Sequence, residues 1–193
     1  MPRRSRKQPV RVLLYGFGPY RKFTENITAK IIESLAPWPG LGKIVFPVRF
    51  QRRQFVEALK PPMPLMVVGL GQSSRPRIEV ETRAINRRRS SKTSAPRPIT
   101  AGGEAWVPAT MPLSVTRPSA KSINAGDYVC NFSMYVMLEE LEREDHNSRF
   151  GFVHIPFDHD LQTACRYVER IVGKCFDLAD RLERDRAAKR LGG

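Results

Sequence analysis

The amino-acid sequence predicts an α/β protein with an open, twisted, mostly parallel sheet that helices cover on both faces. Short apolar runs alternate along the chain with segments of helical apolar spacing, which is the pattern of strand–helix–strand units. The chain has 193 residues, 41% of them hydrophobic, and a single domain of this size buries roughly 70% of its unfolded surface. We therefore expect one domain over residues 10–191, preceded by a basic tail at residues 1–9.

Each expected element follows from a local pattern. Apolar runs predict buried strands at residues 10–15, 43–50, 65–70 and 149–155. Helical spacing predicts helices at residues 24–35, at 52–59, from about Cys130 onward and at 161–191. Between them we expect turns at 16–20 and 71–76, extended chain at 77–86, and a mobile loop at 87–103, which is rich in Ser, Pro, Gly and Arg.

The formal net charge of +14 requires that anionic partners be considered. The basic residues are concentrated before Glu25 and within residues 82–103, and neither stretch contains an acidic residue. The second stretch has no interleaved aromatic residue, which argues against single-stranded nucleic acid as a partner. We expect these charges to be those of a solvated tail and a loop.

Cysteine content and hydropathy indicate the compartment. Three cysteines do not suggest a disulfide framework and fit a reducing environment. No apolar run approaches the ~20 residues that span a bilayer, and the apolar stretch after the basic start is too short for a signal peptide. We expect a cytoplasmic protein with no membrane partner.

The three cysteines differ in their surroundings. Cys165 and Cys175 fall on the apolar stripe of the last expected helix and are predicted to be small core residues. Cys130 stands where a turn feeds a helix, and the N–H groups of a helix N-terminus stabilise a thiolate and could hold an oxyanion. Cys130 is therefore the candidate nucleophile, with a core cysteine as the alternative interpretation.

A base and a carboxylate are available for chemistry at Cys130. His154 stands near the end of an apolar strand, and open α/β sheets place their sites at the ends of parallel strands. Glu79 and Glu81 are the candidate carboxylates, since a carboxylate beside an imidazole fixes its tautomer and supports its charge. We expect no metal, because the chain has no CxxC or HExxH motif. We expect no nucleotide cofactor, because the first turn matches only part of GxGxxG.

Four motifs follow one another along the chain. They are Gly16-Phe17-Gly18-Pro19-Tyr20, then Val68-Gly69-Leu70-Gly71 with Glu81-Thr82-Arg83-Ala84-Ile85-Asn86, then Gly126-Asp127-Tyr128-Val129-Cys130-Asn131, and last Gly151-Phe152-Val153-His154-Ile155-Pro156-Phe157. In this order they resemble the motifs of the pyroglutamyl peptidase type I family, also called pyrrolidone-carboxylate peptidase. The resemblance spans residues 10 to 157.

The resemblance implies a three-layer αβα sandwich and a thiol peptidase that removes N-terminal pyroglutamyl residues from peptides. It implies that Cys130 is the nucleophile, His154 the base and Glu81 the third member. Glu81 is preferred to Glu79, whose replacement we expect to be near neutral. The resemblance further implies that Phe17 and Tyr20 line a lactam pocket, that backbone groups near Leu70 meet the lactam edge, and that the chain forms a homo-oligomer, either dimer or tetramer.

The chain departs from the family in four places. Arg87 to Pro98 replaces a family segment, and Ser73 and Ser74, next to Arg75, stand where the family often has two glycines. Residues 113–126 look about ten residues short, and Asp158-His159-Asp160 follows the histidine motif where the family tends to Glu-Gln. These departures leave two alternatives open. The same fold could act weakly or on another small acyl or amide substrate, or the chain could be a basic nucleic-acid- or anion-binding protein on a retired enzyme scaffold.

Overall fold

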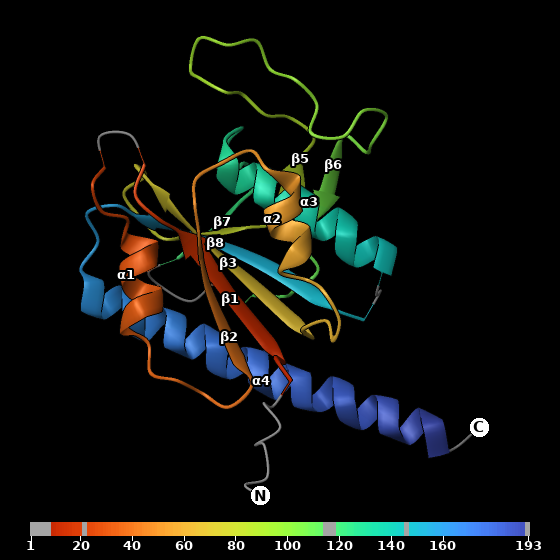
Figure 1. Cartoon of the computed structure of the whole chain (residues 1–193). Coiled ribbons are helices and arrows are strands. Elements are labelled where there is room, and N and C mark those ends of the chain that lie inside the picture. The colour runs from red at the N-terminus through yellow and green to blue at the C-terminus, as the bar shows by residue number, and fades with distance from the viewer. Residues whose placement is uncertain (1–8, 21–22, 114–118, 145–146, 192–193) are drawn as a thin grey trace, which may run out of the picture.

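Six strands form one open sheet in the order β2-β1-β3-β8-β4-β7 (Figure 1). The computed structural model describes residues 9–20, 23–113, 119–144 and 147–191, so the expected tail lies almost entirely outside the described residues. The strands are β1 (Val12–Phe17), β2 (Leu41–Phe46), β3 (Met66–Ser73), β4 (Glu79–Glu81), β7 (Ala120–Ser122) and β8 (Arg149–Pro156). The pairs β1–β2, β1–β3, β3–β8 and β4–β7 are parallel, while β4 runs antiparallel to β8. The expectation of a mostly parallel sheet is confirmed.

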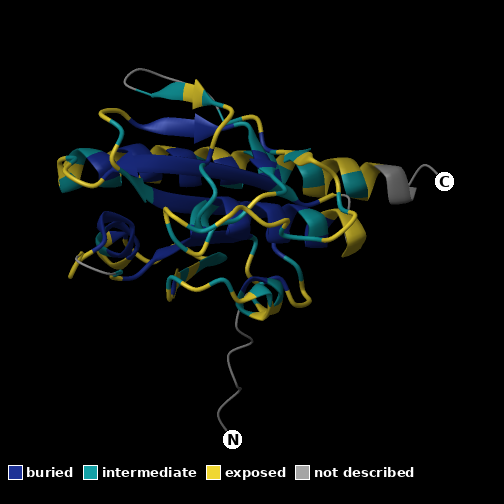
Figure 2. Ribbon diagram, turned by 90° about the horizontal axis from the view of Figure 1, so that it is seen from above, coloured by how far each residue is buried: buried dark blue, intermediate teal, exposed yellow. Residues whose placement is uncertain are grey.

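Helices cover both faces of the sheet and produce the three layers. On one face, Val12 and Leu14 of β1 pack with α1 (Ile27–Ser34) and α4 (Leu161–Leu191). On the other face, Leu13 and Tyr15 pack with α2 (Arg52–Glu57) and α3 (Val129–Glu144). Successive side chains of a strand point to opposite faces, so one apolar run supplies both cores. Figure 2 shows the buried strands running through the middle of the molecule.

Two strands extend further than their sequence predicts. Gly16 and Phe17, expected in a turn, continue β1 because they pair with Val45 and Phe46 of β2. Residues 71–73, also expected in a turn, continue β3 because they pair with β8 as far as Ser73. Tertiary pairing thus overrides the glycine turn signals at both places.

The expected extended segment 77–86 divides between two sheets. Its first part is β4, while β5 (Arg83–Ile85) pairs with β6 (Trp106–Pro108) in a separate two-stranded antiparallel sheet. The helices lie at their expected positions. The first of them, α1, begins after Asn26, whose side chain accepts a hydrogen bond from Thr28 N. The apparent shortening before Gly126 falls partly on residues 114–118, outside the described residues. Among those described, no helix is long and apolar enough to cross a membrane.

Candidate active site

His154 lies near the C-terminal end of β8, at the end of the sheet where the parallel strands β1 and β3 also finish (Figure 1). The residue is buried, with 6% of its surface exposed, and its ring meets the Phe152 ring edge-on at 5.1 Å between centroids. Gly71 of β3 lies beside it, and a Cβ on Gly71 would stand 2.6 Å from His154 Cδ2 and 2.7 Å from Nε2. Gly71, the last residue of the Val68-Gly69-Leu70-Gly71 motif, therefore makes room for the imidazole.

Glu81 fixes the orientation of this imidazole. Its Oε1 lies 2.7 Å from His154 Nδ1, and both groups are buried. In the antiparallel register His154 stands opposite Glu79, while Glu81 stands opposite Phe152. Glu81 thus reaches His154 along the diagonal of the ladder, a distance that long side chains span. Glu79, directly opposite, turns instead to Arg75, with which it forms an ion pair.

Cys130 is the second residue of α3, at the helix N-terminus, as expected. The cysteine is half-buried, and its thiol is near enough to His154 to act on the imidazole, so sulfur, imidazole and carboxylate gather at one place. Burial of the imidazole alone lowers its pKa, but the hydrogen bonds with Cys130 and Glu81 outweigh burial and raise the pKa of His154 to about 9. The arrangement favours a charged imidazole, as a thiolate–imidazolium pair requires.

The raised pKa of His154 makes part of the folding stability depend on pH. Because the pKa rises from an ordinary value of 6.5 to about 9 on folding, the stabilisation is fully present below pH 6.5 and is lost as the pH rises through 9. Urea denaturation of the wild-type protein and His154→Ala should therefore show a stability difference that shrinks between pH 6 and pH 9.5. A difference that grows over this range would contradict the raised pKa.

The other two cysteines have different surroundings. Cys175 is a core residue as expected, and burial raises the pKa of its thiol to about 12. Cys165 is half-buried rather than a full core residue, because it packs at the border of the apolar cluster on the α4 face. Burial and nearby acidic residues still raise the pKa of the Cys165 thiol. Both thiols are thus less prone to ionise than an ordinary cysteine.

The residues expected to line a substrate pocket lie in different environments. Phe17 is 2% exposed and packs against Tyr15 and Phe55, so it belongs to the core beneath the site rather than to a turn. Tyr20 lies beside the loop before Cys130, since its ring packs at a tilt against that of Tyr128, with 5.3 Å between centroids, and the two hydroxyl groups are hydrogen-bonded. Their roles in substrate binding stay predictions.

Leu70 is fully buried on the α1–α4 face of the sheet. Its backbone pairs with Val153 of β8, whereas the β1–β3 register ends one residue earlier, at Tyr15 and Gly69. From Leu70 onward, the side of β3 that faces β1 therefore extends past the last β1–β3 pair, next to the loop that carries Tyr20. This edge is compatible with the predicted backbone contacts to a lactam.

Sequence reasoning missed two supports of the site. Asn131, next to the cysteine, is fully buried; its Oδ1 accepts from Ile85 N, and its Nδ2 donates to the carbonyl oxygens of Ile85 and Arg87, each at 2.8 Å. Arg75 joins the β3–β4 turn to β4 and lies 3.6 Å from the Glu81 carboxylate. The signals that the chain offers for them are a polar residue next to the candidate nucleophile and an arginine four residues before Glu79.

The basic segment that replaces a family motif is tied to the loop before Cys130. Arg89 N donates to the carbonyl of Asp127 at 2.7 Å, and Asp127 Oδ2 lies 2.8 Å from Arg89 Nε. The Arg88 guanidinium stands over the Phe50 ring at 5.7 Å from its centroid, and Phe50 in turn packs edge-on against Tyr128. The segment thus forms one rim of the site. That residues 87–103 are mobile stays a prediction.

A metal site is not evident among these residues. Within the part of the chain that the structure describes, no three His, Cys, Asp or Glu side chains gather closely enough to hold a metal ion.

The contact between Gly71 and His154 leads to a prediction. Gly71→Ala should force the imidazole away from its position and lower kcat by about 10²-fold, because a displacement of about 1 Å in a reacting group has this effect. Steady-state kinetics on the variant would measure the loss. The matched control is Gly173→Ala in α4, where the added Cβ comes no closer than 3.9 Å to any atom outside its own helix turn. Equal kcat in both variants would contradict the steric argument.

The chain is similar to pyroglutamyl peptidases both in sequence and in fold. Residues 10–164 match the family model described as pyroglutamyl peptidase. Pyrrolidone-carboxylate peptidase of Bacillus cereus is 32% identical over 170 residues, which cover 76% of this chain and 78% of the relative. Pyrrolidone-carboxylate peptidase 1 of Saccharolobus solfataricus is 28% identical over 166 residues, which cover 75% and 78%.

Solved structures agree with the sequence relatives. Pyrrolidone carboxyl peptidase of Thermus thermophilus superposes with a TM-score of 0.70 at 25% identity, covering 81% of this chain and 96% of that one. Pyroglutamyl peptidase I of Bacillus amyloliquefaciens superposes with a TM-score of 0.74 at 24% identity, covering 84% and 92%. These relatives are hydrolases, and the chain belongs to the pyroglutamyl peptidase family.

Proposed function

We propose that this chain is a cysteine peptidase that removes N-terminal pyroglutamyl residues from peptides, with Cys130, His154 and Glu81 as its catalytic triad. The observation that supports this most is the cluster of three groups at the sheet edge. The Cys130 thiol acts on the His154 imidazole, whose Nδ1 lies 2.7 Å from Glu81 Oε1. Family membership supplies the substrate class.

The first stage forms a thioester. His154 holds the proton of Cys130, and the Cys130 sulfur attacks the carbonyl carbon of the pyroglutamyl residue. N–H groups at the N-terminus of α3 face the developing oxyanion. The tetrahedral intermediate collapses as the C–N bond breaks, and His154 gives its proton to the departing amine, so the peptide leaves with a free N-terminus.

The second stage regenerates the thiol. His154, now neutral, takes a proton from water, and the hydroxide attacks the thioester carbon. The C–S bond breaks, free pyroglutamate leaves, and the sulfur again pairs with the imidazole. Glu81 keeps Nδ1 protonated throughout, so that Nε2 faces the reacting atoms. The reaction needs no cofactor.

A chromogenic pyroglutamyl amide tests the proposal. Release of the amine is expected, and prior treatment with iodoacetamide should abolish it. The matched substrate is the same chromogenic amide carrying proline, which lacks the lactam carbonyl and should be cleaved far more slowly. Absence of amine release at high enzyme concentration would overturn the assignment of substrate.

The rim formed by residues 87–89 supports a second candidate, in which the same triad acts on another small acyl or amide substrate. This segment replaces a family motif and contacts both Asp127 and Asn131 beside the nucleophile. If the pyroglutamyl amide is inert, a panel of small acyl thioesters and amides distinguishes this candidate, since Cys130 would still be acylated. A cytoplasmic location and self-association as a dimer or tetramer remain predictions.

A further inference from the structure

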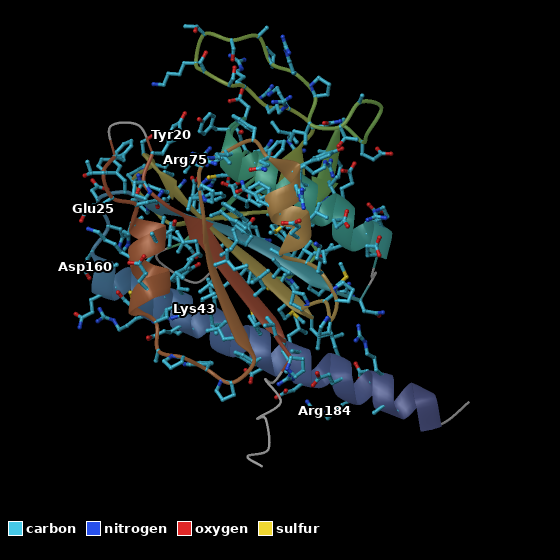
Figure 3. The ribbon with its side chains drawn as sticks, in the orientation of Figure 1. Tyr20, Glu25, Lys43, Arg75, Asp160 and Arg184 are labelled. Carbon is cyan, nitrogen blue, oxygen red and sulfur yellow. The ribbon has the colours of Figure 1, made fainter. Side chains whose placement is uncertain are left out.

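Arg75 lies just beyond the carboxyl end of β3, in the turn that leads to β4 (Figure 3). Its Nη2 donates to the carbonyl oxygen of Asn124 at 2.6 Å, and its Nη1 donates to Ser122 Oγ at 3.1 Å. Nη1 also hydrogen-bonds to the Glu79 carboxylate. These contacts join the turn after β3 to β4, to β7 and to the loop that leads to Cys130.

The same guanidinium contacts the carboxylate that orients the imidazole. Arg75 Nη1 lies 3.6 Å from Glu81 Oε1, which is an ion-pair distance. Oε1 is also the atom that faces His154 Nδ1. One oxygen of Glu81 therefore stands between the arginine and the histidine.

Glu81 depends on its neighbours because its side chain is fully buried. Its second oxygen, Oε2, is buried without a hydrogen-bond partner among the described residues. Glu79, on the same face of β4, is 12% exposed and contacts the same Arg75 nitrogen. Two largely buried carboxylates that approach the same guanidinium nitrogen repel each other, and the cation between them offsets this repulsion.

We propose that Arg75, anchored by Glu79, is a positioning residue that holds the Glu81 carboxylate against His154. The proposal rests on the proposed function, in which His154 is the base. Arg75 acts through Glu81 and touches no reacting atom. Glu79 then has a part in the site, contrary to the expectation that its replacement is near neutral.

The shape of arginine suits this role. Its planar fork reaches Asn124 with one nitrogen and the two glutamates with the other, whereas a lysine ammonium is a single point charge. A lysine at position 75 would keep the charge between the carboxylates but lose part of the fixed geometry. Arg75→Lys should therefore retain more function than Arg75→Gln.

Steady-state kinetics test the positioning role. Arg75→Gln should lower kcat by about 10- to 100-fold with KM changed by less than about threefold, because the Glu81 carboxylate loses its alignment with the imidazole. Arg75→Lys should recover a substantial part of the loss. A fall in kcat/KM that comes entirely from KM would overturn the proposal.

A second readout does not need turnover. The charged and titratable groups around His154 are Cys130 from α3, Glu79 and Glu81 from β4, and Arg75 before β4. The chain has three histidines, so the imidazole signal of His154 can be assigned by its loss in His154→Ala. In Arg75→Gln the loss of a nearby cation raises the pKa of His154, whereas the loss of an aligned carboxylate lowers it. Because Glu81 is the direct hydrogen-bond partner of the imidazole, we expect the second effect to prevail and the pKa measured by NMR titration to fall.

Arg11→Gln is the matched control. Arg11 is likewise partly buried and paired with two carboxylates, Asp180 and Glu183 of α4, but it precedes β1 at the opposite end of the sheet. This variant should lose stability without changing kcat or the His154 titration. If Arg75→Gln does not fold, Glu79→Gln takes its place, since it removes only the anchor and should lower kcat by a smaller factor.

The outcomes separate the two proposals. An inactive wild-type protein whose His154 titration still shifts in Arg75→Gln would overturn the peptidase assignment and keep the positioning role. An active wild-type protein whose kcat and His154 titration are unchanged in folded Arg75→Gln, or in Glu79→Gln when that variant stands in, would overturn the positioning role.

Discussion

Replacing Cys130 with serine is expected to lower kcat/KM for a pyroglutamyl amide by about 10³-fold or more. A serine hydroxyl does not ionise where a thiol next to an imidazolium does, so the variant lacks its nucleophile. The fold should survive, because the change is nearly isosteric at a half-buried helix start. Comparing the rates of wild-type and variant enzyme, with matched circular dichroism spectra, measures the effect.

Cys165→Ser is the control for this prediction. Cys165 is also half-buried and lies on α4, away from His154, so its replacement should leave kcat/KM unchanged. Brief, substoichiometric iodoacetamide treatment followed by mass spectrometry adds a second measurement. Cys130 should be modified first, because burial raises the pKa of both other thiols. Equal labelling of the three cysteines, or a Cys130→Ser enzyme with most of its turnover, would refute the thiol mechanism.

Replacing His154 with alanine is expected to cost a similar factor of about 10³. The imidazole is the group that holds the Cys130 proton and delivers it to the leaving amine, and without it the Glu81 carboxylate also loses its partner. The double variant with Cys130→Ser should be no slower than either single variant, because the members act as one unit. Kinetics of the three variants under one condition measure this coupling.

His159→Ala is the control for the histidine. Its Nδ1 lies 3.0 Å from the carbonyl oxygen of Asp160 in the turn after β8, outside the cluster formed by Cys130, His154 and Glu81. The expected change in kcat/KM is less than about twofold. If the losses in Cys130→Ser and His154→Ala multiply in the double variant, the two residues do not work in one step, and the proposed triad fails.

Much of the fold was predictable from the sequence because burial leaves a direct mark on it. A central parallel strand is covered on both faces, so β1 and β3 appear as continuous apolar runs. The α4 stripe and the start of α3 at Cys130 follow equally from local patterns. The candidate nucleophile and base could be named because each stands at the end of such an element.

Other features were decided only by the tertiary structure, because they depend on residues far apart in the chain. Strand pairing extended β1 over Gly16 and Phe17, which placed Phe17 in the core instead of in a turn. The antiparallel register of β4 against β8 set Glu81 on the diagonal to His154, while Glu79 forms an ion pair with Arg75.

Sequence alone therefore determined which residue types were available at the edge of the sheet, since local periodicity follows from local burial. The tertiary structure decided which carboxylate meets the imidazole and which cation stands behind it. The physical reason is that hydrogen bonds and ion pairs act over about 3–4 Å. The chain brings Arg75, Glu81 and His154 within that range, with Cys130 beside them, only when β3, β4, α3 and β8 have packed together.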